Sequence, residues 1–240
     1  MAKKHHNQNV KCNVKITPIS VIDLERRGSE RRIKLSKVKA YSAFPHEIAT
    51  MSAEMFCRDS KLIVDPFGGW GERGYAVKNE GKQYVGFDLS DDAIDHAKEQ
   101  YDVELTKGDS RVVDVPVHDG LITCPPYWNL ERYNNVNGLD HCRDWENFLI
   151  EYEHILSRFA EKAQKGATYC IATGDWRKGG RYHDLTFETQ RIMKALGFVI
   201  FDVVIMNRKK NTPVGRMLPN SYRMGYTAKV HETLTVFRKV

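Results

Sequence analysis

The sequence predicts an α/β fold in which a mostly parallel sheet carries helices on both faces. Three observations support this prediction. Apolar runs that fit strands alternate with helical patterns over most of the 240 residues. One such run is followed by glycines at positions 68, 69 and 71, which permit a tight turn into a helix. The next run ends in Asp88, at the sheet edge where doubly wound folds bind ligands.

The expected elements of the first half follow one another in order. Residues 14–19 alternate enough for a short edge strand, and a helix is expected over about 45–58. Apolar runs that end in a glycine or a carboxylate predict the next three strands, over 61–65, 83–88 and 103–108.

The second half continues the alternation. Two prolines end an apolar run over 119–123, because they lack the N–H that a strand ladder uses. Asp144 can cap a helix whose apolar residues recur with the helical period as far as Phe159. The remaining expected elements are a strand over 167–172, a helix over 184–196 stopped by Gly197, and an antiparallel pair of strands over 198–206 and 232–237.

The connection between the last two strands, residues 207–230, is the most unusual part of this half. It contains six lysines and arginines and no acid, and we expect it to be a structureless loop. A loop of this length in a compact domain is usually functional.

Charge is distributed unevenly along the chain. The formal net charge is +6, yet residues 1–40 hold eleven Lys/Arg against three acids. A basic arm on a nearly neutral body favours a polyanionic partner. For residues 1–12 a solvated tail is the simpler interpretation.

The cysteines and the N-terminus bear on location. The five cysteines form neither a C-x-x-C pair nor a metal-ligand pattern, so we expect no disulfide framework and no metal site. Lys3 and Lys4 are not followed by an apolar stretch, and the sequence has no 18-residue apolar run. We therefore expect a cytoplasmic protein.

The glycine turn and the acids that follow it indicate a nucleoside cofactor. Asp88 lies where such folds bind ribose hydroxyls, and Asp109 follows the third strand, where an adenine edge would lie. The glycines do not follow the dinucleotide spacing, and no P-loop lysine comes after them. A cofactor without a pyrophosphate fits these residues better.

The run Thr123-Cys124-Pro125-Pro126-Tyr127-Trp128 indicates the substrate. The carbonyls of Cys124 and Pro125 cannot join a helix and are free to accept hydrogen bonds. The aromatic pair that follows offers flat faces for stacking. Acceptors beside an aromatic platform suit an amine on a planar ring, such as the exocyclic amine of a nucleobase.

With these features the sequence resembles the amino-methyltransferases of DNA, which use S-adenosylmethionine to methylate the N4 of cytosine or the N6 of adenine. Asp65-Pro66-Phe67-Gly68-Gly69-Trp70-Gly71 is similar to the family's cofactor loop, and Pro125-Pro126-Tyr127 is similar to its catalytic motif. Residues 43–47 resemble the segment that closes over the cofactor, and residues 231–239 resemble the last strand. The resemblance covers roughly residues 38–240.

This resemblance implies a Rossmann-like class I methyltransferase fold with a seven-stranded sheet. The chain would comprise a basic N-terminal arm, 1–37, and a single methyltransferase domain, 38–240. Within that domain the cofactor half, 38–115, precedes the catalytic half, 116–240.

The resemblance also implies roles for individual residues. The implied cofactor-binding residues are Phe44, Asp65, Phe67, Gly69, Gly71, Asp88 and Asp109. The implied catalytic residues are Cys124, Pro125, Pro126 and Tyr127, acting by base flipping and direct methyl transfer without a metal. Two residues depart from the family pattern: Trp70 replaces a small residue, and Cys124 replaces an acid, amide or serine.

Cys124 bears on the target base in two ways. Preceded by a threonine, the motif is closest to the form common in N4-cytosine enzymes, so cytosine is favoured over adenine. A nucleophilic role for Cys124, as in C5-cytosine chemistry, is not favoured, because the order is Cys-Pro-Pro and no basic residue is evident beside it.

Double-stranded DNA is the expected partner. The residues expected to contact it are Trp128, Arg177, Arg208, Lys209, Arg216 and Arg223. The chain has no room for a separate recognition domain, which by analogy suggests a phage enzyme or one that accompanies a restriction nuclease. Two alternatives stay open: an RNA amino-methyltransferase, and a catalytically silent nucleic-acid-binding protein with the same fold.

Overall fold

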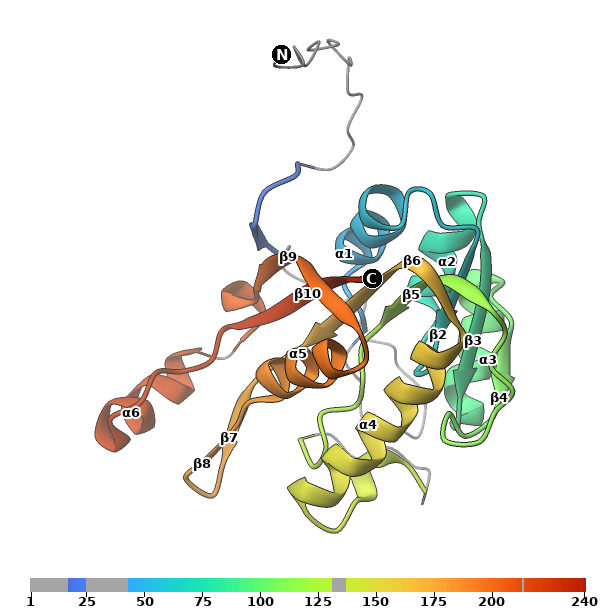
Figure 1. Ribbon diagram of the computed structural model, residues 1–240. Coiled ribbons are helices and arrows are strands. Elements are labelled where there is room, and N and C mark those ends of the chain that lie inside the picture. Colours follow the sequence, from blue (N-terminus) through green and yellow to red (C-terminus); the bar gives the residue numbers. More distant parts are fainter. Residues whose placement is uncertain (1–16, 25–42, 131–136, 213) are drawn as a thin grey trace, which may run out of the picture.

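The protein is built around one eight-stranded sheet with helices on both faces (Figure 1). The computed structural model describes residues 17–24, 43–130, 137–212 and 214–240. The strand order is β1-β9-β10-β6-β5-β2-β3-β4. Strand β10 is antiparallel to both of its neighbours, and the other pairs are parallel. The strands are β1 (Val21–Asp23), β2 (Leu62–Asp65), β3 (Gln83–Asp88), β4 (Leu105–Lys107), β5 (His118–Thr123), β6 (Ala163–Thr173), β9 (Phe198–Asn207) and β10 (His231–Lys239).

Helices connect most of these strands. They are α1 (His46–Met51), which continues as the π-helix η2 (Ser52–Phe56), α2 (Glu72–Asn79), α3 (Asp91–Tyr101), α4 (Trp145–Lys162), α5 (Leu185–Ala195) and α6 (Val214–Met224), with short 3-10 turns η3 (Leu139–His141) and η4 (Lys209–Asn211). None of the helices in the described ranges is long and apolar enough to cross a bilayer.

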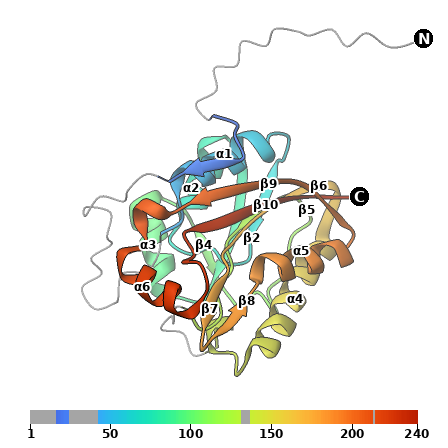
Figure 2. The same cartoon turned by 90° about the vertical axis from the view of Figure 1, so that its left-hand side faces the viewer.

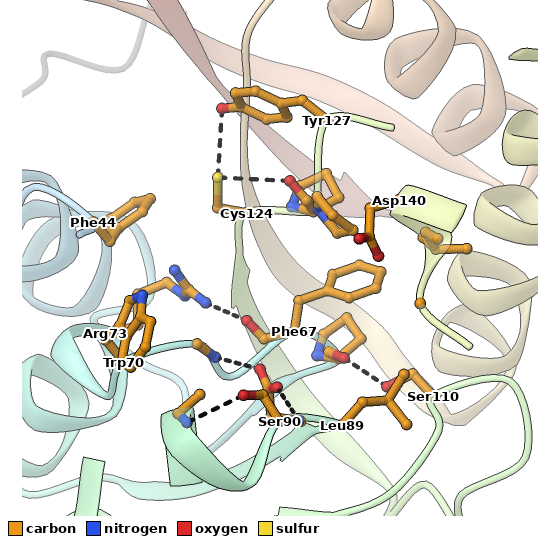
Figure 3. Close-up of a pocket in the computed structure, with 18 of the residues that line it drawn as sticks. Phe44, Phe67, Trp70, Arg73, Leu89, Ser90, Ser110, Cys124, Tyr127 and Asp140 are labelled. Carbon is orange, nitrogen blue, oxygen red and sulfur yellow. Dashed lines mark hydrogen bonds between the residues drawn. The ribbon is translucent and has the colours of Figure 1, made fainter. Parts of the chain in front are cut away.

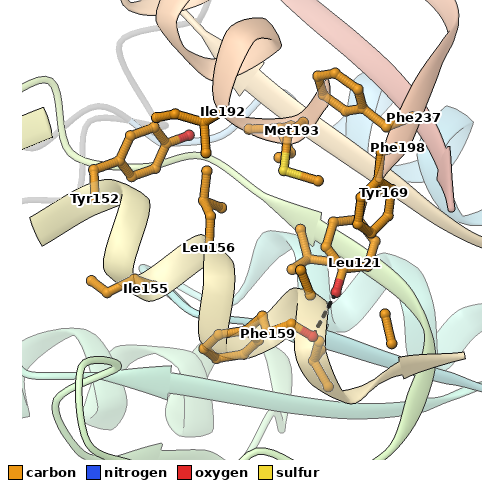
Figure 4. Packing of buried hydrophobic residues seen from close by; sticks show 14 of the residues in the cluster. Leu121, Tyr152, Ile155, Leu156, Phe159, Tyr169, Ile192, Met193, Phe198 and Phe237 are labelled. Carbon is orange, nitrogen blue, oxygen red and sulfur yellow. Dashed lines mark hydrogen bonds between the residues drawn. The ribbon is translucent and has the colours of Figure 1, made fainter. Parts of the chain in front are cut away.

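The central strands β2 and β5 are buried along almost their whole length because both faces of the sheet are covered there. Leu121 and Tyr169 point to the face packed by α4 and α5 (Figure 4), whereas Ile122 and Cys170 point to the face packed by α1 and η2. The predicted cap of α4 is confirmed, since the Asp144 carboxylate accepts the backbone N–H of residue 147 at 2.8 Å.

The N-terminal edge strand lies later in the chain than predicted. We expected it over 14–19, but residues 14–16 lie outside the described residues and 17–19 form no strand. Instead β1, at 21–23, adds an eighth strand beside β9. Of the predicted arm, 1–37, the structure describes only residues 17–24.

The connection 207–230 is not the structureless loop that we expected. It contains η4 and the three-turn helix α6, in which Pro219 is an internal residue. Val214, Met217 and Ser221 follow the helical spacing and are at least half-buried, but Gly215 and Pro219 between them weaken the helical signal.

A hairpin that the sequence did not predict stands beside α6 (Figures 1 and 2). Its strands are β7 (Trp176–Lys178) and β8 (Arg181–His183), and both glycines of the turn, Gly179 and Gly180, have positive φ. A Gly-Gly pair favours this kind of two-residue turn. The guanidinium of Arg177 lies 4.9 Å from the ring centre of Tyr226, which joins the hairpin to the segment after α6.

Candidate active site

A cavity lies at the carboxyl edge of strands β2, β3, β4 and β5 (Figure 3). Among the residues predicted to bind the cofactor, Phe44, Phe67, Gly69, Asp88 and Asp109 line it. The loop after β2 forms its floor, and the Pro-Pro-Tyr segment after β5 forms the opposite wall.

Asp65 does not line this cavity. It forms hydrogen bonds to several of the segments that do. The side chain is fully buried. One of its oxygens accepts the backbone N–H of Phe67 at 3.0 Å and the Thr123 hydroxyl at 2.6 Å. The other accepts Nε of Arg73 at 2.7 Å and the Tyr84 hydroxyl at 3.0 Å. Asp65 therefore ties the glycine loop to β5 and β3.

Arg73 supplies the positive charge that balances the buried Asp65 carboxylate. Burial alone would lower the pKa of Arg73, but the Asp65 charge raises it above the ordinary arginine value. A second guanidinium nitrogen donates to the Phe67 carbonyl, and the guanidinium carbon lies 4.9 Å from the Phe44 ring centre. Arg73 itself lines the cavity. The sequence analysis missed it, because the fold alone brings Asp65, Phe67 and Phe44 around its side chain.

The glycine loop is shaped by two residues with positive φ. Gly71 has φ +99°, and a Cβ there would lie 2.8 Å from the Ala97 Cβ, so the close approach of α2 to α3 requires glycine. Gly71 does not line the cavity. Gly69, with φ +59°, does line it and donates its N–H to Asp88 at 2.8 Å. The unusual Trp70 is accommodated in the wall, with the His96 ring edge-on at 5.2 Å.

Asp88 presents a carboxylate that the backbone holds in place. Its oxygens accept the N–H groups of Gly69 at 2.8 Å and Ser90 at 2.9 Å. Burial raises the pKa of Asp88, and these two backbone hydrogen bonds oppose the shift. Each carboxylate oxygen can accept a further hydrogen bond, so Asp88 can still receive hydroxyls from a ligand.

Asp109 lines the cavity, but its oxygens are already engaged. The Arg111 guanidinium pairs with them at 2.6 Å and also donates to the backbone carbonyl of Asn137. Partial burial alone would raise the pKa of Asp109. The hydrogen bonds from Arg111 outweigh this effect, so the pKa lies below its ordinary value. The neighbouring Ser110 hydroxyl donates to the Pro66 carbonyl at 2.6 Å, which fixes this wall against the glycine loop.

The segment Cys124-Pro125-Pro126-Tyr127 lines the cavity along its whole length. The Tyr127 ring stacks on Trp176 of the hairpin, with centroids 6.1 Å apart and planes at 18°. Its hydroxyl lies 3.5 Å from the Cys124 sulfur. The predicted catalytic residues are therefore together at one wall.

Cys124 is a protonated thiol in this setting. Burial raises the pKa of Cys124 to about 11. The expectation that no basic residue lies nearby is wrong, because the charges of Arg73 and Arg208 both act on the thiol. Each of these arginines is paired with a carboxylate, Asp65 or Glu232. The thiol is therefore not activated as a nucleophile, in agreement with the sequence interpretation.

Trp128 is not placed as a nucleic-acid contact. Its indole N–H donates to the Cys142 carbonyl at 2.9 Å, and its ring packs edge-on against His183 at 5.2 Å. It lines neither of the two cavities described here. Its φ is +40°, and its ring also packs against Trp145 at 6.0 Å.

A second cavity adjoins the first, between the β7–β8 hairpin and α6. The two cavities share four lining residues: Tyr127, Leu130, Arg208 and Glu232. Of the predicted DNA contacts, Arg177, Arg208 and Arg216 line the second cavity, whereas Lys209 and Arg223 are exposed outside it.

The sequence analysis missed two acids of the site. Glu232 is only 13% exposed and pairs with Arg208 at the junction of the cavities. Asp140 is 1% exposed and lines the first cavity from η3. Neither carries a local motif, so only the fold could reveal them. No group of three metal-ligating side chains was found among the described residues.

The sequence matches no protein-family model and no curated protein. Solved structures nevertheless share its fold. TrmN from Thermus thermophilus aligns over 81% of this chain with 14% identity and a TM-score of 0.51, and the chain spans about half (52%) of that structure. Magnesium protoporphyrin IX methyltransferase from Synechocystis, with bound S-adenosylmethionine, aligns over 81% of this chain and 79% of its own, with 10% identity and a TM-score of 0.53.

A third structure, a methyltransferase dependent on S-adenosylmethionine from Methanosarcina mazei, aligns over 78% of this chain and 96% of its own. Its identity is 11% and its TM-score 0.54. At these identities the likeness concerns the fold. The chain has the Rossmann-like class I methyltransferase fold, as the sequence predicted.

Proposed function

We propose that the protein methylates an exocyclic amine of a base in DNA, using S-adenosylmethionine, and that N4 of cytosine is the favoured target. The observation that carries the proposal is the place of the Pro-Pro-Tyr segment. The segment lines a cavity suited to a nucleoside cofactor, and its Tyr127 also lines a cation-lined cavity that opens beside α6.

The first cavity fits S-adenosylmethionine without requiring a pyrophosphate site. Asp88 has acceptor capacity for ribose hydroxyls, and Gly69 lets the ligand approach the backbone. Phe44 and Phe67 supply apolar walls on either side of the Arg73 guanidinium. When bound, this cofactor supplies a methyl group activated by an adjacent sulfonium. Asp65 would act on it indirectly, by holding the loop.

The target base would enter through the second cavity. Flipping it from the duplex costs a few kcal/mol, and stacking on the Tyr127 ring recovers part of that cost. Trp176 lies behind the ring and fixes its plane. The Pro125 carbonyl accepts a hydrogen of the amine and orients the nitrogen lone pair, so catalysis consists mainly of positioning and electrostatics.

The cations around the second cavity suit the phosphates that flank a flipped nucleotide. Arg177 stacks between the rings of Tyr182 and Tyr226, at 4.9 Å from each centre, which holds its charge at the rim. Arg216 reaches the same cavity from α6. Two cations on opposite walls can contact one backbone without specifying sequence.

Nucleoside mass spectrometry tests this proposal. DNA and RNA would be incubated with the purified protein and labelled S-adenosylmethionine, then digested to nucleosides. N4-methylcytosine or N6-methyladenine in DNA is the expected result and identifies the base. Label in RNA alone would instead favour the RNA amino-methyltransferase, and no transfer to either would favour the silent binding protein.

A further inference from the structure

The amine of a target base has two hydrogens, and the side chain before the two prolines would hold one of them. The Pro125 carbonyl, which the Cys124 thiol approaches at 4.0 Å, can accept the other. The residue before the prolines is Cys124, whose protonated thiol is a weak acceptor. An amine held by one hydrogen bond can rotate, and its lone pair is then poorly oriented.

Glu232 lies near Cys124 and Tyr127, where a second acceptor for the amine is needed. It follows His231 at the start of β10, and the pairing of Thr233 with Thr173 places it near Gly174, the residue that follows β6. A Cβ at Gly174 would lie 3.0 Å from the Glu232 Cγ and 3.2 Å from the Tyr127 Cε2. The absent side chain of Gly174 therefore leaves room for a carboxylate beside the stacking ring.

The charge of Glu232 reaches both residues of the wall. It is among the groups that raise the pKa of Cys124 and of Tyr127, after burial of these side chains. Arg208 holds the carboxylate through an ion pair with one of its oxygens. Both members of the pair line both cavities. The carboxylate is therefore placed between the entrance for the base and the wall that the cofactor faces.

We propose that Glu232 is a catalytic residue that accepts the second hydrogen of the target amine, in place of the side chain that Cys124 does not supply. This inference rests on the proposed function. In the transfer the nitrogen lone pair forms the new N–C bond, and the methyl–sulfur bond breaks with its electron pair left on sulfur. The proton that the nitrogen must lose passes to the Glu232 carboxylate and from there to water in the second cavity. Arg208 is a positioning residue.

The test compares Glu232→Gln with the double variant Cys124→Asp/Glu232→Gln. The single variant keeps the size of the side chain and removes its basicity, so we expect the turnover of methylated DNA to fall about 100-fold, as for loss of a general base. The double variant restores a carboxylate at the adjacent position and should recover at least about 10-fold of that loss. Cys124→Asp alone should bring no gain.

Two further measurements separate catalysis from folding. Binding of S-adenosylhomocysteine, followed by the fluorescence of Trp70 in the cavity wall, should stay within about twofold for both variants. Glu188→Gln is the matched control, because Glu188 also pairs with an arginine, at 2.8 Å, but on α5 away from both cavities. Its turnover should equal that of the wild type.

The outcomes are distinguishable from failure of the proposed function. If the wild type methylates no base, both proposals are wrong. If it does, but Glu232→Gln keeps full turnover, only the present inference is wrong. Glu232→Gln could also lower turnover and the affinity for S-adenosylhomocysteine equally, without rescue by Cys124→Asp. That result would assign Glu232 a structural role and overturn the inference.

Discussion

The two cavities of the site differ in how the chain builds them. Much of the lining of the first comes from short segments at the ends of parallel strands, at 66–73, 88–90, 108–111 and 124–127. The walls of the second come from the hairpin and from the region 208–232, which β9 and β10 bring together. The first cavity is a property of the sheet edge, whereas the second is an addition to it.

The polar groups of the two cavities differ in the same way. In the first, the carboxylates of Asp65 and Asp88 accept backbone N–H groups and fix the loop before any ligand arrives. In the second, Arg177 and Lys229 lie against tyrosine rings, and Arg177 is exposed. The proposed function assigns the small cofactor to the first, preorganised cavity and DNA to the second, with Tyr127 at their boundary.

The largest expected effect is a loss of stability on replacing Asp65, the buried residue that supports the first cavity. Asp65→Ala leaves the buried Arg73 charge without its partner, which typically costs about 3–5 kcal/mol. We expect urea unfolding at neutral pH to show a loss of that size. The matched control is Glu188→Ala, which breaks a partly exposed pair and should cost less than about 1 kcal/mol. Equal losses for the two variants would show that Asp65 does not support the loop.

Tyr127→Ala tests the boundary between the cavities. Stacking of a base on an aromatic ring is worth about 1–3 kcal/mol, so kcat/KM for DNA should fall about 10- to 100-fold. Binding of the cofactor, measured by calorimetry, should stay within about twofold. Tyr222→Ala, at a tyrosine of α6 that is 92% exposed, is the control and should change neither quantity. Comparable loss of activity and cofactor binding would point to a structural role for Tyr127.

Asp88→Asn should give the reverse pattern. The amide loses the charge and one acceptor, so the hydrogen bonds to ribose hydroxyls weaken by about 1.5 kcal/mol. Calorimetry should then show about 10-fold weaker binding of S-adenosylmethionine. DNA affinity, measured without cofactor, should match that of the wild type. A variant that binds the cofactor normally would remove Asp88 from the ribose site.

The same comparison explains what the sequence could predict. Features of the first cavity are local: a glycine turn after a strand and an acid that ends the next strand. Gly69 and Asp88 were therefore placed at the cavity from these local features together with Asp109, and the family resemblance added Phe44 and Phe67. Asp65 was identified too, but its four hydrogen-bonding groups lie on three other segments and on the loop itself, so its buried position could not be derived.

The second cavity depends on contacts between residues far apart in the sequence. Glu232 meets Arg208 across 24 residues, and Gly174, just after β6, makes room for it. Pro219 and Gly215 hid the helical spacing of α6, and the β7–β8 hairpin was not predicted from the sequence. Trp128 was expected to face a ligand, but its indole hydrogen bond to residue 142 depends on the fold of a loop.

The smallest expected effect concerns α6 and sharpens the assignment of the second cavity to DNA. Arg216→Ala/Arg223→Ala removes two cations from this helix, of which Arg216 lines the cavity and Arg223 is exposed. Each phosphate contact contributes about 0.9 to the slope of log affinity against log salt. We therefore expect the slope, measured by fluorescence anisotropy with duplex DNA, to become about 1–2 units shallower.

The control for this variant is Lys98→Ala/Arg191→Ala, which removes the same charge from α3 and α5, away from the second cavity. A uniform effect of net charge would lower the affinity of both double variants equally. A contact between α6 and the phosphates lowers it, and flattens the slope, only for the first. An unaltered slope for Arg216→Ala/Arg223→Ala would place the DNA elsewhere and leave the hairpin, with Arg177, as the remaining wall to test.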